Sequence, residues 1–248
     1  MIKLLAKVVL LGATCITTLA HSAISLDRTR VIFNGNSQSV SIAIKNKNDH
    51  LAYLAQSWIE NANGEKISQP FVVLPPLQRV EPDQGSQIRI EAMENKIEEL
   101  PQDRETIFYF NLREIPPKSN KPNVLQIALQ SKIKMFYRPS NIILTSTEMN
   151  NNPWQEKLVL EKQGTQVLAK NPTAYYTTIL SLQTSKDSKI NQDVESLMIP
   201  PFSEVKLPIT VKDMGNSPVL TYVNDYGATP KLQFQCQSDS CQVVKIKE

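Results

Sequence analysis

Histidine is scarce in this 248-residue chain, and its scarcity limits the chemistry that the chain can perform. Of the two histidines, His21 lies in the amino-terminal segment and His50 lies in a polar turn, KNKNDHL. A nucleophilic side chain needs an adjacent base, and no serine stands in a nucleophile-elbow sequence. We therefore expect His50 to be a solvated loop residue, and we expect neither a catalytic residue nor a small-molecule substrate.

Glycine is scarce as well, and charge of neither sign dominates. The seven glycines form no cluster that could cradle a phosphate, which argues against nucleotide binding. The 27 basic and 24 acidic residues are interspersed, whereas nucleic-acid-binding domains gather their cations on one face. No local motif marks the paired carboxylates of a glycoside hydrolase. These absences predict a protein without a cofactor and without a nucleic-acid partner.

Cysteine is limited to three residues, of which Cys15 lies in the amino-terminal segment. The other two, Cys236 and Cys241, lie close together near the carboxyl end. A metal site is the alternative use for such a pair, but zinc needs about four ligands and few are available. The simplest interpretation is one disulfide that closes a small loop, with no metal site.

The first residues have the layout of a secretory signal. A basic start with Lys3 leads into an apolar run over residues 8–20, which is shorter than the roughly 20 apolar residues of a membrane span. The small residues that follow predict cleavage after Ser22, with cleavage after Ala23 as the alternative. We therefore predict a signal peptide over residues 1–22 and an oxidising destination in which a disulfide persists.

Long helical periodicity is absent from the remaining chain, and short alternating runs take its place. They include SVSIAIKN from Ser39, TIFYFNLR from Thr106 and VLQIALQ from Val124, separated by turn signals such as Asn34-Gly35. Such runs are typical of strands in an all-β sandwich. A polar stretch over 145–153 precedes a second set of runs, so we expect two domains, 23–145 and 146–248. Only residues 95–100 suggest a helix, and that helix is short.

Several segments resemble the PapD-like periplasmic pilus chaperones. They are SLDRTRVIF from Ser25, YLAQSWIEN from Tyr53, LPQDRE from Leu100, FYFNLREIPPK from Phe108, NVLQIALQSKIKMFYRP from Asn123 and YVNDYG from Tyr222. The resemblance covers the mature chain in order and is weakest over residues 163–217. The short connection over 114–122 resembles the short-loop branch, which assembles rod-like pili.

The resemblance implies two immunoglobulin-like β-sandwich domains at an angle, with a cleft between them that receives the carboxyl terminus of a pilus subunit. It implies a periplasmic chaperone that binds pilin subunits, prevents their premature aggregation and delivers them to an outer-membrane usher. Two rival functions are an adhesin or carbohydrate-binding sandwich and a periplasmic hydrolase. An adhesin should present aromatic residues on its loops, yet the two tryptophans lie in a strand pattern (Trp58) and near the linker (Trp154).

The resemblance also assigns an anchor for the subunit's terminal carboxylate. It maps to Arg30 in LDRTR and Lys134 in KIKMFYRP. Two cations that meet one carboxylate form charge-assisted hydrogen bonds, which are stronger than neutral ones. Without the resemblance, both would be interpreted as ordinary surface charges.

A strand over residues 124–135 is predicted to hold the subunit. Leu125, Ile127 and Leu129 alternate and share one face, which periodicity alone assigns to the core. The resemblance implies instead an exposed edge whose side chains fill the groove of a pilin, an incomplete sandwich that lacks its last strand. Ile133 extends this face, and because Lys134 has the opposite parity we expect a bend or bulge within 131–134.

Three further assignments follow from the resemblance. A charged cluster that sets the angle between the domains maps to Glu105, Arg138 and Asp225. Candidates for the usher contact are Leu54, Pro75, Pro76 and Ile115. A second copy of the chain is a further expected partner, capping the same exposed edge when no subunit is bound.

Overall fold

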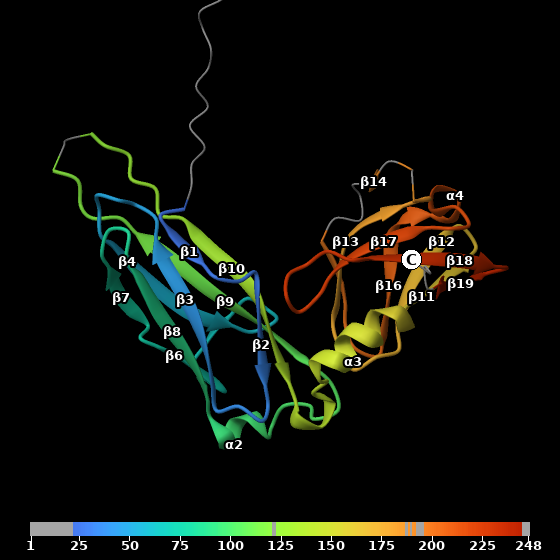
Figure 1. The fold of residues 1–248 in the computed structure, drawn as a ribbon, viewed down its shortest axis with the longest axis horizontal. Helices are drawn as coiled ribbons and strands as arrows, with labels where there is room; N and C mark the ends of the chain where they lie inside the picture. The colour runs from blue at the N-terminus through green and yellow to red at the C-terminus, as the bar shows by residue number, and fades with distance from the viewer. Residues whose placement is uncertain (1–21, 121–122, 187, 189, 192–195, 245–248) are drawn as a thin grey trace, which may run out of the picture.

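The computed structural model describes residues 22–120, 123–186, 188, 190–191 and 196–244. The predicted signal peptide therefore lies outside the described residues except for Ser22. Within the described part, the strands form two β bodies that lie at an angle (Figure 1). They are joined through the end of β10 (Gln130–Arg138) and α3 (Ser146–Asn151). No helix of the described residues is long and apolar enough to cross a membrane.

The first body is built from two sheets. One has the order β1-β3-β8-β6, with bounds β1 (Ile24–Leu26), β3 (Ser39–Asn46), β8 (Gly85–Ala92) and β6 (Phe71–Leu74). The other has the order β2-β10-β9-β4-β5, and β7 also pairs with β4. Its bounds are β2 (Arg30–Asn34), β10 (Gln130–Arg138), β9 (Thr106–Ile115), β4 (Tyr53–Glu60), β5 (Lys66–Ile67) and β7 (Leu77–Val80).

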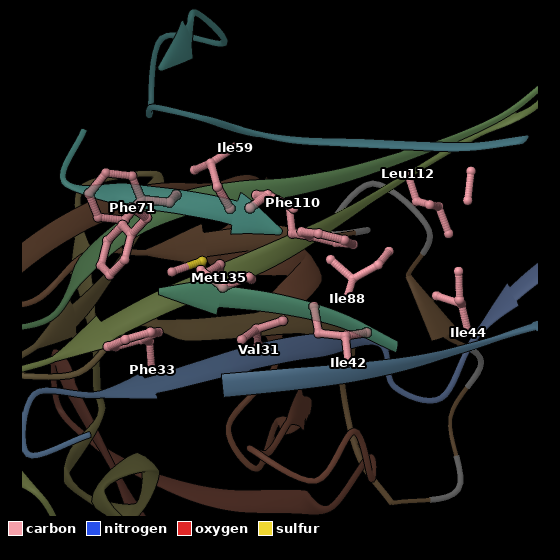
Figure 2. Close-up of a cluster of buried hydrophobic side chains, with 14 of the residues drawn as sticks. Val31, Phe33, Ile42, Ile44, Ile59, Phe71, Ile88, Phe110, Leu112 and Met135 are labelled. Atoms are coloured by element: carbon pink, nitrogen blue, oxygen red, sulfur yellow. The ribbon is translucent and has the colours of Figure 1, made fainter. Parts of the chain in front are cut away.

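The two sheets enclose an aromatic and aliphatic core (Figure 2). The predicted alternation in β3 is confirmed, because Ile42 and Ile44 are buried while their neighbours are exposed. Phe71 lies among three other rings, with its centroid 4.9 Å from that of Phe33 and 5.1 Å from that of Phe108. Each such side chain stabilises the fold by about 1.5–3 kcal/mol through burial.

The second body is one continuous hydrogen-bonded sheet that folds around its own core, with the order β14-β13-β17-β18-β19-β11-β12-β16 and β15 beside β13. The bounds are β11 (Val159–Gln163), β12 (Gln166–Asn171), β13 (Thr177–Gln183), β14 (Ile190–Asn191), β15 (Leu197–Ile199), β16 (Ser203–Thr210), β17 (Val219–Val223), β18 (Lys231–Gln237) and β19 (Ser240–Val244). The predicted disulfide is confirmed, since Cys236 and Cys241 are bonded across the β18–β19 hairpin.

Short helices connect the strands of the described residues, and only α2 (Glu94–Ile97) was predicted from the sequence. The others are α3 (Ser146–Asn151), α4 (Val211–Met214) and the 3₁₀ turns η1 (Ser140–Ile142) and η2 (Trp154–Lys157). The expectation of a single helix was therefore wrong. Thr145 begins α3 with a reciprocal capping box to Glu148, a polar signal that stabilises a helix start. The domain boundary predicted at 145/146 falls at this cap and stays a prediction.

The strand predicted over 124–135 is corrected by the structure. Residues 124–129 are described without a partner strand, and β10 begins at Gln130. The bend expected within 131–134 is also wrong, because β10 pairs with β9 in unbroken register from Gln130 to Tyr137. Alternation reports which way side chains face, but a strand also needs a hydrogen-bonding neighbour, which the sequence pattern does not reveal.

Candidate functional site

Two cations lie side by side on neighbouring strands of the first body. β2 and β10 run parallel, and their pairing begins at Lys134 opposite Arg30. The Arg30 guanidinium reaches the second body, where its Nη1 donates a 3.2 Å hydrogen bond to the carbonyl oxygen of Val223. Its Nε is buried without a hydrogen-bond partner. Neither cation forms an ion pair with a carboxylate of the described residues.

Arg30 and Lys134 are partly buried next to each other, and both have lowered pKa values. Burial is the main cause that lowers the pKa of Lys134, and the neighbouring charge of Arg30 lowers it further. Burial likewise lowers the pKa of Arg30, while Asp225 and Glu105 act in the opposite direction. Like charges destabilise each other where water is partly excluded, so an anion bound between the two would relieve both effects. The arrangement suits a carboxylate.

An open sheet edge leads up to these cations. Because β2 pairs with β10 only from Lys134 onward, residues 130–133 have no strand beside them on that side among the described residues. The preceding segment exposes three aliphatic side chains: Leu125 is 85% exposed, Ile127 65% and Leu129 37%. Exposed aliphatic side chains beside unpaired backbone groups form a surface that favours the addition of another strand.

Alternation along β10 separates its two faces. Ile133 packs partly against the core of the first body and Met135 is fully buried there. Lys134 and Phe136 face the opposite side, where the Phe136 ring lies 5.5 Å from that of Tyr176 in the second body. Ile133 and Lys134 therefore face opposite sides of β10, whose register with β9 is unbroken.

The predicted charged cluster comes together between the two bodies. The Arg138 guanidinium donates to Glu105 Oε1 from Nε at 2.9 Å and from Nη2 at 2.7 Å. Its Nη1 donates to Asp225 Oδ2 at 2.8 Å. The backbone N–H of Tyr176 donates to Glu105 Oε2 at 2.7 Å. One guanidinium thus bridges a carboxylate of the first body and one of the second, which is the fork geometry that arginine favours.

Burial shapes the acid–base behaviour of this cluster. Glu105 is 3% exposed and Arg138 2%, and the guanidinium lies 5.2 Å from the ring of Trp154. Burial raises the pKa of Glu105 to about 7, although the Arg138 charge and the Tyr176 N–H oppose the rise. The pKa of Arg138 is raised by its two carboxylate neighbours, against its own burial. The cluster is therefore a buried ionic contact between the two bodies.

The candidates for the usher contact lie on one part of the first body. Leu54 and Ile115 are register partners on β4 and β9, and Pro75 and Pro76 are exposed between β6 and β7. Two exposed neighbours, Leu74 and Leu77, flank the prolines and were not predicted from the sequence; they are 41% and 49% exposed.

A polar network on the same sheet as Arg30 and Lys134 was also not predicted from the sequence. Glu60 accepts hydrogen bonds from Lys132 Nζ at 2.6 Å and from Trp58 Nε1 at 2.8 Å. Lys132 lies 4.5 Å from the ring centroid of Tyr109. These residues alternate on three neighbouring strands, but strand order cannot be read from the sequence. No group of three or more metal-ligating side chains occurs among the described residues.

Comparison with protein families finds two matches in chain order. Residues 23–143 match the family described as "Pili and flagellar-assembly chaperone, PapD N-terminal domain". Residues 153–234 match "Pili assembly chaperone PapD, C-terminal domain". Together the two matches span nearly the whole described chain.

Known proteins agree with these matches. The chain is 47% identical to the probable fimbrial chaperone YfcS of Escherichia coli K12, covering 94% of this chain and 90% of that protein. It is also 47% identical to the chaperone protein PapD of Escherichia coli, covering 92% of each chain. Among solved structures, the periplasmic chaperone SfaE matches with a TM-score of 0.67 and 32% identity, over 85% of this chain and 98% of that one.

Proposed function

This chain belongs to the PapD family of pilus-assembly chaperones, and from that premise we propose how its own residues hold a subunit. The subunit's terminal carboxylate binds between Arg30 and Lys134. Its incomplete sandwich then accepts the open edge of the first body as a substitute strand. The chain thereby keeps the subunit folded and soluble until it is delivered for assembly.

The observation that carries the proposal is the register pairing of Arg30 with Lys134. These residues are far apart in the sequence, yet parallel pairing brings them together at the start of an open edge. The Nε of Arg30 is buried without a hydrogen-bond partner, so the hydrogen-bonding capacity of this guanidinium is not satisfied in the free protein. Each charge-assisted hydrogen bond to the carboxylate should contribute about 1.5–3 kcal/mol.

The open edge would supply the second contact. Leu125, Ile127 and Leu129 project from a segment outside the described strands, in which the carbonyl oxygen of Leu129 accepts one hydrogen bond from the Glu114 N–H of β9. A donor strand needs such exposed side chains and an open edge. Each aliphatic side chain that enters an apolar groove should contribute about 1.5–3 kcal/mol. Ile133 is assigned to the end of this set, where it also packs against the core of its own domain.

The remaining assignments complete the proposal. Glu105, Arg138 and Asp225 fix the angle between domains 23–145 and 146–248, so that the anchor and the open edge keep their relative positions. The exposed surface with Leu54, Pro75, Pro76 and Ile115 contacts an outer-membrane usher. When no subunit is bound, two copies pair through their open edges. The chain acts in the periplasm after removal of its signal peptide, and it performs no catalysis.

Co-purification tests the proposal. The full chain is expressed with a pilin encoded beside it, and the periplasmic complex is isolated for wild type, Ile127→Ser and a control, Val244→Ser. Val244 is an exposed aliphatic residue of the second body, 39% exposed at the end of β19. We expect wild type and Val244→Ser to retain the pilin and Ile127→Ser to lose most of it. Equal yields from all three proteins would contradict the donor-strand role.

A further inference from the structure

One buried carboxylate of the first body has no role in the site described above. Glu114 lies on β9 and is 5% exposed. Its Oε2 accepts two hydrogen bonds of 2.8 Å, from the backbone N–H of Ile24 and from the hydroxyl of Ser22. No cation of the described residues forms an ion pair with it. Both donors are neutral, so the negative charge of this buried carboxylate is not compensated by a cation, and a positive partner would stabilise it.

Ala23 lies between the two residues that donate to Glu114, and it is held in place. It is 9% exposed, and its carbonyl oxygen accepts a 2.7 Å hydrogen bond from the N–H of Lys47. In the structure Ser22 still precedes Ala23. Cleavage after Ser22, as the sequence predicts, removes the Ser22 hydroxyl and turns the nitrogen of Ala23 into an α-ammonium group.

We propose that the α-ammonium of Ala23 in the processed chain forms an ion pair with the buried carboxylate of Glu114. Signal removal then exchanges a neutral donor for a charged one at the same carboxylate. Lys47 is the competing cation, because its side chain lines the same cavity. It is exposed and forms no ion pair with Glu114.

This ion pair adjoins the segment that we assign to the subunit. The backbone N–H of Glu114 donates a 3.0 Å hydrogen bond to the carbonyl oxygen of Leu129. A cavity of about 390 Å³ lies here, lined by Ser22, Ala23, Lys47, Asn48, Tyr53, Glu114, Ile127 and Leu129. Glu114 is thus a positioning residue for the base of the open edge. This coupling rests on the proposed function, whereas the ion pair itself does not.

Selective acylation of the amino terminus tests the ion pair without any subunit. The exported chain is purified, its first residue is identified by intact mass, and the acylation rate of the α-amine is measured near neutral pH. An unperturbed α-amine has a pKa of about 7.7–8.0. A buried carboxylate partner should raise it by about one unit, which slows acylation about tenfold relative to Glu114→Gln. The control Glu98→Gln, at an exposed glutamate, should react like wild type.

A second variant removes the ion pair while the Glu114 side chain is kept. An added alanine before Ala23 keeps Glu114 but displaces the ammonium by one residue, and its amine should react about ten times faster than that of wild type. Equal rates for wild type, Glu114→Gln and the extended chain would overturn the ion pair, and would leave Lys47 as the partner. A mature chain that begins at Ile24 would overturn it as well.

Amide exchange then tests the coupling to the open edge. Exchange of the Glu114 N–H, followed by NMR on the free protein, reports its hydrogen bond to Leu129. We expect severalfold faster exchange in the extended chain than in wild type. Unchanged exchange would overturn the coupling. Because no pilin is present in these assays, a failure here is distinct from a failure of the proposed subunit binding.

Discussion

Replacing Arg138 with methionine should destabilise the protein strongly. The change removes three hydrogen bonds of 2.7–2.9 Å and leaves Glu105 buried with the Tyr176 N–H as its remaining described donor. Removal of one partner from a buried ion pair costs about 3–5 kcal/mol, because the other charge stays desolvated. We therefore expect the free energy of unfolding of Arg138→Met to fall by about that amount in urea titrations at a pH above the raised pKa of Glu105, where this carboxylate is ionised in wild type. The ring of Trp154 lies 5.2 Å from the Arg138 guanidinium, so its fluorescence reports unfolding at the contact between the two bodies.

The double variant Arg138→Met/Glu105→Gln gives the matched control. It removes both charges of the closest pair, so its loss should be clearly smaller than the sum of the two single losses. A loss below about 1 kcal/mol for Arg138→Met alone would refute a buried ionic contact between the domains, since that size is typical of exposed ion pairs.

Three further predictions concern Lys134, Glu105 and Gly227. A bound carboxylate should raise the lowered pKa of Lys134, so binding should be accompanied by proton uptake. Calorimetry at alkaline pH in buffers of different ionisation enthalpy measures this uptake, and its absence would argue against the anchor. Burial raises the pKa of folded Glu105 to about 7, so the folded protein binds a proton more tightly than the unfolded chain does. The stability of wild type relative to Glu105→Gln should therefore fall by at most about 3 kcal/mol as pH rises from about 4.5 to 7, and then level off. A rise in stability over this range in urea titrations would contradict the burial argument. Gly227→Ala should lower the temperature of thermal unfolding more than Gly64→Ala does. Both glycines have positive φ, but of the two only Gly227 would bring a Cβ against a neighbour, Thr29 Oγ1 at 2.7 Å. Equal losses of stability would mean that this contact between the bodies is unimportant.

Local alternation predicted the strands well where a sheet face is buried, as at Ile42 and Ile44. It failed over 124–129, because alternation cannot tell whether a neighbouring strand is present. The same limit applies to Ile133, whose parity is shared by exposed Ile127 and by fully buried Met135.

The candidate site could not be predicted from local sequence patterns, because it is formed by contacts between distant parts of the chain. Nothing local marks Arg30 and Lys134 as neighbours, and only the resemblance to a family joined them before the parallel pairing was seen. Glu114 was missed because its donors, Ser22 and Ile24, lie some 90 residues earlier. The capping box from Thr145 to Glu148 was a missed feature with a readable local signal, a threonine followed by a glutamate at the third position. Thr210, which is followed by Asp213, marks the start of α4 in a similar way.

The central claim, that Arg30 and Lys134 anchor a subunit's terminal carboxylate, is tested most directly by a two-way affinity measurement. Fluorescence anisotropy compares a peptide from the carboxyl end of the pilin encoded beside this chain, in its free-acid and amidated forms, on wild type and on Arg30→Ala. We predict that amidation weakens binding to wild type about 10- to 100-fold and weakens binding to Arg30→Ala far less, because the carboxylate and the guanidinium act together. Equal losses on both proteins, or no loss on wild type, would contradict the anchor.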